Sequence, residues 1–77
     1  MEIELISFGK ISEVIANQKI VVTEVIDTDS LKSFLEIEFP ELKKMKYKLA
    51  MNKQLIQQNT AITNNANIAI MPPFSGG

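Results

Sequence analysis

The chain has 77 residues, a net charge of −1 and no Cys, His or Trp, and this composition excludes several functions. Without Cys or His it has no thiol nucleophile, no disulfide and none of the usual ligands of zinc or iron–sulfur sites. With 8 Lys+Arg against 9 Asp+Glu it has no strong basic field for nucleic acid, and at this length we expect one domain without a deep catalytic cleft.

The first residues do not resemble a targeting signal. Met1-Glu2-Ile3-Glu4 begins with acids rather than with a cationic segment, and no apolar run approaches the roughly 18 residues that span a bilayer. We therefore expect a soluble, cytoplasmic protein that binds neither membrane nor nucleic acid.

The first part of the chain changes from a strand pattern to a helical one and back. Apolar and acidic residues alternate over Met1–Leu5, which predicts a half-buried strand that ends at Gly9. Over Lys10–Ala16 the apolar residues have helical spacing, which predicts a short helical turn. Ile20–Val25 is rich in β-branched residues, so we expect it to pair with the first strand as a long hairpin.

Asp27-Thr28-Asp29-Ser30 marks the start of a helix, because short oxygen-bearing side chains accept hydrogen bonds from the free N–H groups of the first turn. Which of the four is the cap stays open. The helix is expected to run from about Asp29 to Phe39 and to stop before Pro40. Its apolar face, expected to cover the sheet, contains Leu31, Phe34 and Leu35.

The second part of the chain is predicted to contain a hairpin and a final strand. Tyr47–Met51 and Leu55-Ile56 have strand patterns, and Asn52–Gln54 between them suits a tight turn. A polar loop then returns the chain for a last strand over Ile68–Met71, which Pro72 ends.

The order of elements is strand, strand, helix, strand, short strand, strand. This order matches an α+β fold of the β-grasp, or ubiquitin-like, type, with a mixed sheet of four to five strands and one main helix packed on it. We expect the first and last strands to be central and parallel. Residues 1–71 are then the β-grasp domain, and residues 72–77 form an extended tail.

The ending Pro72-Pro73-Phe74-Ser75-Gly76-Gly77 is the most informative motif. Two glycines without Cβ atoms can thread a channel that excludes other residues. The prolines favour polyproline II, so at roughly 3.1 Å per residue the six residues could project on the order of 18 Å. The pattern predicts that the carboxylate of Gly77 is the reacting group, delivered into another protein; the alternative is an ordinary frayed terminus.

Three segments, Phe8–Glu13, Leu49–Asn52 and Ile68–Gly77, together resemble the small subunit of molybdopterin synthase, and the resemblance covers the whole chain. The Pro-Pro-x-Ser/Thr/Ala-Gly-Gly ending is its most specific part. The resemblance implies that Gly77 is adenylated by an activating enzyme, converted to a thiocarboxylate and inserted into the large catalytic subunit to donate sulfur for the dithiolene of molybdopterin. It also implies a heterotetramer of small and large subunits.

Adenylation is needed because an α-carboxylate with a pKa of about 3.5 is anionic at neutral pH and a poor electrophile. The chain has no Gly-rich loop that could hold phosphates, so we expect the activating partner to bind ATP. The chain itself is then a sulfur-donating subunit that binds no cofactor or metal and has no active site of its own.

A partner surface is predicted from strand parity. If the alternating apolar residues of the first strand face the core, Phe8 points to the opposite face, and Met71 does the same in the last strand. With Leu55 and Phe74 they would form an apolar patch at the root of the tail. The resemblance also places a hydrophobic partner contact at Phe8, Leu55 and Met71; the alternative is that Phe8 and Met71 fill a second, minor core.

A loose basic cluster is the remaining candidate, formed by Lys43, Lys44, Lys46, Lys48 and Lys53. It is either a solvated face or a docking site for an acidic partner.

For the whole protein, three other functions stay open: a sulfur carrier of the thiamine type, a ubiquitin-like modifier, and an interaction module with an inert tail.

Overall fold

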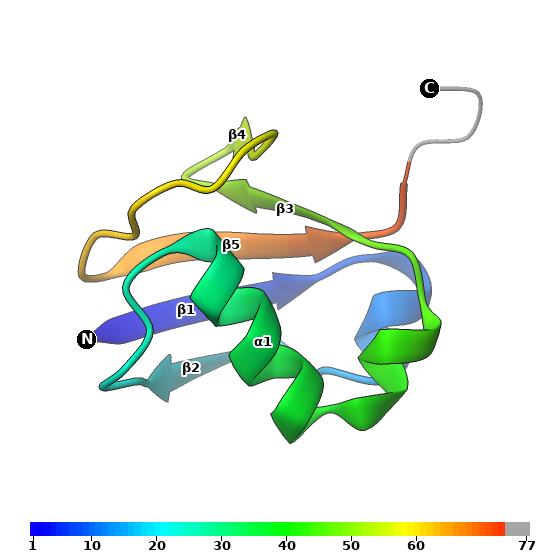
Figure 1. Ribbon diagram of the computed structural model, residues 1–77. Coiled ribbons are helices and arrows are strands. Elements are labelled where there is room, and N and C mark those ends of the chain that lie inside the picture. Colours follow the sequence, from blue (N-terminus) through cyan, green and yellow to red (C-terminus); the bar gives the residue numbers. More distant parts are fainter. Residues whose placement is uncertain (74–77) are drawn as a thin grey trace.

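In the computed structural model, which describes residues 1–73, a five-stranded mixed sheet carries one long helix across one face (Figure 1). The strands, in the spatial order β2-β1-β5-β3-β4, are β1 (Glu2–Ser7), β2 (Gln18–Val21), β3 (Lys48–Met51), β4 (Gln54–Leu55) and β5 (Ala66–Met71). The helices are α1 (Thr28–Glu38) and two 3-10 helices, η1 (Gly9–Glu13) and η2 (Pro40–Lys44). β1 and β5 are parallel and the other pairs are antiparallel, so the predicted β-grasp fold is confirmed.

The core lies between α1 and the two parallel strands. Leu5 of β1 lies beside Ile68 of β5 in the register, and alternate residues of both strands face α1. The core side chains with no exposed surface are Ile3, Leu5, Ile11, Ile15, Leu31, Leu35, Leu42, Ile68 and Ile70. They come from β1, η1 and the residues after it, α1, η2 and β5, so almost every segment is anchored to one core.

Several elements differ in extent from those expected: β5 begins at Ala66 rather than Ile68, and β4 covers Gln54–Leu55 rather than Leu55-Ile56. The strand predicted over Ile20–Val25 ends early, because β2 covers Gln18–Val21. Val22 still exchanges backbone hydrogen bonds with Met1, at 2.8 Å in each direction, and the side chains of Val22 and Val25 are buried in the core. The connection after α1 forms η2, whose Leu42 is fully buried.

Asp27 is the N-cap of α1. Its carboxylate accepts from the backbone N–H of Ser30 at 2.9 Å and from the Ser30 hydroxyl at 2.6 Å, and Nδ2 of Asn59 donates to it at 3.1 Å. Oδ1 of Asn59 in turn accepts from the backbone N–H of Asp29 at 2.9 Å. The cap therefore also fastens the long loop before β5 to the start of the helix.

The cap predicts a pH dependence of stability. The hydrogen bond from the Ser30 side chain, followed by those from its backbone and from Asn59, lowers the pKa of Asp27 from its ordinary value of 3.8. Folding then favours the ionised carboxylate, so this stabilisation is present above about pH 4 and is lost as the pH falls toward the lower folded pKa.

We expect Asp27→Asn to lower the melting temperature at neutral pH and to shrink the drop in melting temperature between neutral pH and about pH 2. Circular dichroism melts at both pH values would measure this. Asp29→Asn is the matched control, since Asp29 lies in the same first turn but is not the cap. Equal effects of both substitutions would contradict the role of the cap.

Candidate functional site

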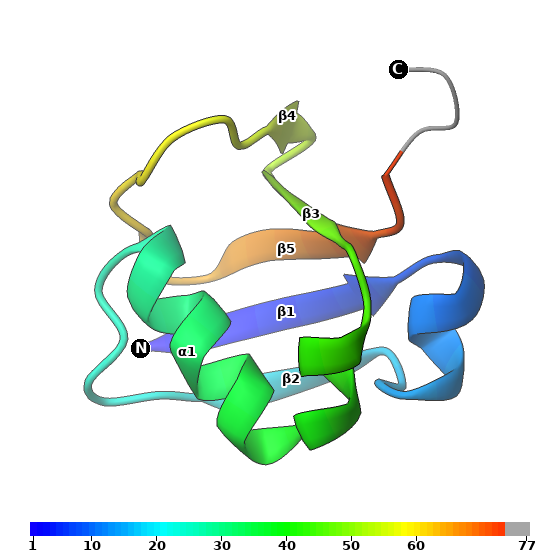
Figure 2. The same ribbon diagram turned by 45° about the vertical axis from the view of Figure 1, so that its right-hand side comes forward.

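The chain leaves the sheet at the carboxyl end of β5. β5 ends at Met71, and Pro72 and Pro73 follow with exposed side chains. η1 and η2 lie at this same end of the sheet (Figure 2). The predictions on Phe74, Ser75, Gly76 and Gly77 lie outside the described residues and stay predictions.

Gly9, expected only to end a strand, also supports the base of the tail. Its φ of +56° lies in the left-handed region, and a Cβ built on it would stand 3.1 Å from Cγ of Pro72. The backbone N–H of Phe8 donates to the carbonyl of Ile70 at 3.0 Å, and the Ser12 hydroxyl donates to the carbonyl of Gly9 at 2.6 Å. η1 therefore packs directly on the first tail residue. A lone glycine between a strand and a helical pattern is the sequence signal for such a close approach.

We expect Gly9→Ala to lower the free energy of unfolding by about 1–2 kcal/mol, because a Cβ is unfavourable at this φ and also crowds Pro72. Gly9→Asn should cost less, since Asn tolerates the left-handed region. Urea denaturation of both variants would measure the difference. Wild-type stability in both would contradict this packing of η1 on the base of the tail.

The sheet face opposite α1 carries an apolar band that crosses four strands. In the register, Ile6 of β1 lies beside Ala69 of β5. Ala69 lies beside Ala50 of β3, which lies beside Leu55 of β4. These four residues define the apolar band, with small alanines in the middle and larger side chains at both ends. Leu55 is exposed, Ile6 and Ala69 are half-buried and Ala50 is buried, so the accessible parts of the band are those available for contact with another protein.

Phe8 and Met71 extend the apolar band toward the tail. Phe8 has an extended backbone, so its side chain continues the alternation of β1 on the face of Ile6 and is 50% exposed. Met71 lies on the face of Ala69 and is half-buried, and Leu55 is 40% exposed. The structure thus brings Phe8, Leu55 and Met71 onto one face of the sheet, while their contact with a partner stays a prediction.

A polar row bounds the apolar band on the side away from the tail. Nδ2 of Asn67 donates to Oε1 of Glu4 at 3.2 Å, and the backbone N–H of Asn67 donates to Oδ1 of Asn52 at 3.0 Å. Glu4 also lies beside Lys19 of β2 in the register. The apolar part of this face therefore lies in the half of the sheet nearest the tail.

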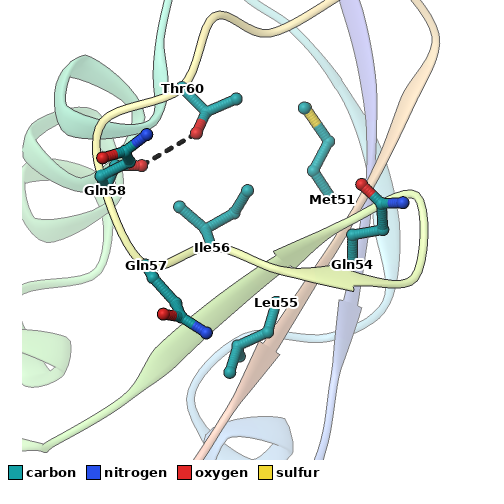
Figure 3. Close-up of a pocket in the computed structure, with 7 residues that line it drawn as sticks. All are labelled: Met51, Gln54, Leu55, Ile56, Gln57, Gln58 and Thr60. Carbon is teal, nitrogen blue, oxygen red and sulfur yellow. Dashed lines mark hydrogen bonds between the residues drawn. The ribbon is translucent and has the colours of Figure 1, made fainter.

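A hollow at β4 and the loop after it adjoins the apolar band (Figure 3). Its lining residues are Met51, Gln54, Leu55, Ile56, Gln57, Gln58 and Thr60. Thr60 Oγ1 donates to the carbonyl of Gln58 at 2.8 Å, which holds the loop in shape. The lining includes no acid or base, so this hollow offers apolar contact and amide hydrogen bonds rather than acid–base chemistry.

Tyr47 holds the chain before β3 to α1. Its hydroxyl donates to Oε2 of Glu36 at 2.5 Å, and burial, followed by this hydrogen bond, raises the pKa of Tyr47 well above its ordinary value. The phenol is therefore a neutral donor at physiological pH.

In the part of the chain that the structure describes, no cluster of three or more His, Cys, Asp or Glu could hold a metal ion.

Within residues 1–73 no helix has the length and apolarity that a membrane span requires.

A β-grasp sheet with an apolar band on one face, from whose central strand the C-terminal segment leaves beside Gly9, is the architecture of the ubiquitin-like class of proteins. Among protein-family models, that of the ThiS family matches residues 5–77, and the chain belongs to this family of ubiquitin-like sulfur carriers.

Three solved structures share the fold of this chain, and one of them is also 30% identical to it in sequence. A Pyrococcus furiosus protein described as subunit 1 of a molybdopterin converting factor matches with a TM-score of 0.83 at 10% identity, over 95% of this chain and 98% of that one. SAMP1 from Haloferax volcanii matches with a TM-score of 0.78 at 18% identity, over 100% of both chains. A chain of the complex of subunits 1 and 2 of the Helicobacter pylori molybdopterin-converting factor matches with a TM-score of 0.74 at 30% identity, again over 100% of both chains. The family resemblance and the fold expected from the sequence are therefore confirmed.

Proposed function

We propose that this chain is the small, sulfur-donating subunit of a molybdopterin synthase. The observation that carries this proposal is the 30% identity, over the full length of both chains, with a chain from the complex of subunits 1 and 2 of a molybdopterin-converting factor. The Pro-Pro-x-Ser-Gly-Gly ending of the sequence supports the same assignment.

The proposed reaction takes place at the acyl carbon of Gly77. A carboxylate oxygen of Gly77 attacks the α-phosphate of ATP on the activating enzyme, which releases pyrophosphate and leaves an acyl adenylate. Sulfur delivered at the oxidation level of hydrosulfide then attacks the acyl carbon, AMP leaves, and a thiocarboxylate remains. Its nucleophilic sulfur attacks the pterin precursor in the large subunit, and water hydrolyses the resulting thioester, which leaves the sulfur on the pterin and restores the carboxylate of Gly77. Two such transfers supply the two sulfur atoms of the dithiolene. The chain is thus a co-substrate that binds no cofactor of its own.

In this proposal the described part of the chain supplies the docking surface. The apolar band, extended by Phe8 and Met71, packs against the large subunit while the tail enters its active site. Apolar side chains at the centre of such an interface lose water on both partners and so stabilise the complex. A heterotetramer of two small and two large subunits is the proposed assembly. The need for ATP makes the cytoplasm the proposed compartment.

The test is a reconstitution with the full-length chain. It is incubated with the activating enzyme of the same genome, ATP and a sulfur donor, and the mass of the C-terminal peptide is measured. We expect an increase that corresponds to one oxygen replaced by sulfur. The charged protein is then mixed with the large subunit and the pterin precursor, and formation of the dithiolene product is measured.

Each alternative gives a different result in this experiment. A thiamine-type carrier would acquire sulfur but would not yield the dithiolene product with the large subunit. A ubiquitin-like modifier would form covalent adducts with lysines of other proteins. A module with an inert tail would show no change in mass.

A further inference from the structure

Charge is distributed unevenly along this chain. All nine acidic residues lie at or before Glu41, whereas five of the eight lysines lie between Lys43 and Lys53, a stretch without any acid. All five of these lysines are exposed. The net charge of −1 therefore conceals an acidic first part and a basic second part.

Four of the five lysines lie at the end of the sheet from which the chain leaves β5. Lys43 and Lys44 end η2, Lys46 follows it, and Lys48 opens β3 directly beside Met71 in the antiparallel register. Figures 1 and 2 both show the start of β3 next to the end of β5, with η2 leading into it. We call these four residues the basic rim: Lys43, Lys44, Lys46 and Lys48. The fifth, Lys53, lies in the turn at the other end of β3.

Three acids, Glu36, Glu38 and Glu41, closely precede the basic rim along the chain, and no acid follows it. Glu36 already accepts the hydrogen bond from Tyr47, and Glu41 lies in the first turn of η2, ahead of Lys43 and Lys44. The cross-strand neighbour of Lys48 is an apolar side chain, Met71. Positive charge is thus concentrated beside the apolar contact surface and around the base of the tail.

We propose that the basic rim docks on carboxylates that surround the opening of the protein that receives the tail. This inference rests on the proposed function and adds the chemistry of the partner surface. Exposed lysines at the edge of an apolar contact act mainly on the rate of association and its salt dependence, because they steer the encounter before the apolar surfaces meet. The partner is a protein rather than a polyanion, since a net charge of −1 gives the chain no overall attraction to nucleic acid.

Two variants of equal charge test the proposal. One is Lys44→Gln/Lys46→Gln in the basic rim. The matched control is Lys19→Gln/Lys53→Gln, whose lysines lie on β2 and in the β3–β4 turn; Lys32 is left unchanged because it lines one hollow with Lys48. The probe is the large synthase subunit of the same genome, and its association rate with the full-length chain is measured by stopped flow at low and high NaCl.

At low salt we expect the rim variant to associate about tenfold more slowly than the wild type and to lose most of the salt dependence. The control should stay within about twofold of the wild type, because Coulomb interactions with distant carboxylates are screened. Both variants should keep the wild-type melting temperature; if the rim variant does not, Lys43→Gln/Lys44→Gln, which changes two exposed lysines of η2 and carries the same expected effect, replaces it.

Equal rates for the rim variant and the control would overturn the proposal, as would rim-dependent binding to RNA that exceeds binding to the large subunit. The same experiments distinguish failure of the proposed function from failure of the rim proposal. If the wild type does not bind the large subunit and acquires no sulfur, both proposals are wrong; if it does both but the rim variant behaves like the control, only the rim proposal is wrong.

Discussion

Removal of Gly76 and Gly77 is expected to abolish sulfur transfer and to leave the melting temperature unchanged. The reacting group of the proposed mechanism is the terminal acyl carbon, so a chain that ends at Ser75 presents its carboxylate two residues short of the active site. Within residues 1–73 all completely buried core residues lie at or before Ile70, so we expect stability not to depend on the last two residues. Mass measurement of the C-terminal peptide after incubation with the activating enzyme would test this.

Two controls sharpen this experiment. One alanine added after Gly77 should also abolish transfer. It moves the carboxylate by one residue and adds a Cβ to the part of the tail that, in the proposed mechanism, enters the partner protein. Ser75→Ala should retain transfer, since the ending of the small synthase subunits that this chain resembles accepts Ser, Thr or Ala at this position. Sulfur acquired by the truncated or the extended chain would show that Gly77 is not the reacting residue.

Phe8→Asp is expected to weaken binding to the large subunit by about 100-fold, which corresponds to about 3 kcal/mol. The change removes an aromatic side chain that is 50% exposed in the isolated chain and places a carboxylate where the partner would have to desolvate it. Isothermal titration calorimetry with the large subunit would measure the loss. The fold should persist, because half of the Phe8 side chain is already in water.

Val21→Asp is the matched control for Phe8→Asp. Val21 is 73% exposed and lies on β2 beside Glu2, outside the apolar band. We expect its substitution to change affinity by less than about threefold. Equal losses for Phe8→Asp and Val21→Asp, or a large fall in melting temperature for Phe8→Asp, would contradict the proposed interface.

Most of the fold could be predicted because its signals are local. Alternation in β1, the cap at Asp27, the turn at Asn52-Lys53 and the stop at Pro72 each depend on the φ/ψ and hydrogen-bonding preferences of a few neighbouring residues. The family resemblance also depended on contiguous motifs, above all the ending. The predicted length of β2 was wrong because the β-branched Val25 has the same strand propensity whether it pairs with a neighbouring strand or fills the core.

The sequence by itself therefore determined the elements, their order and the chemistry available to the chain. These properties depend on the side chain of each residue and on the backbone preferences of its near neighbours. Only the tertiary structure decided which distant residues meet. Ile6, Ala69, Ala50 and Leu55 form one band because three strand registers align them, and Gly9 supports Pro72 because parallel pairing of β1 and β5 brings both strand ends together. Such pairings depend on the packing of the whole core, which no short stretch of sequence specifies.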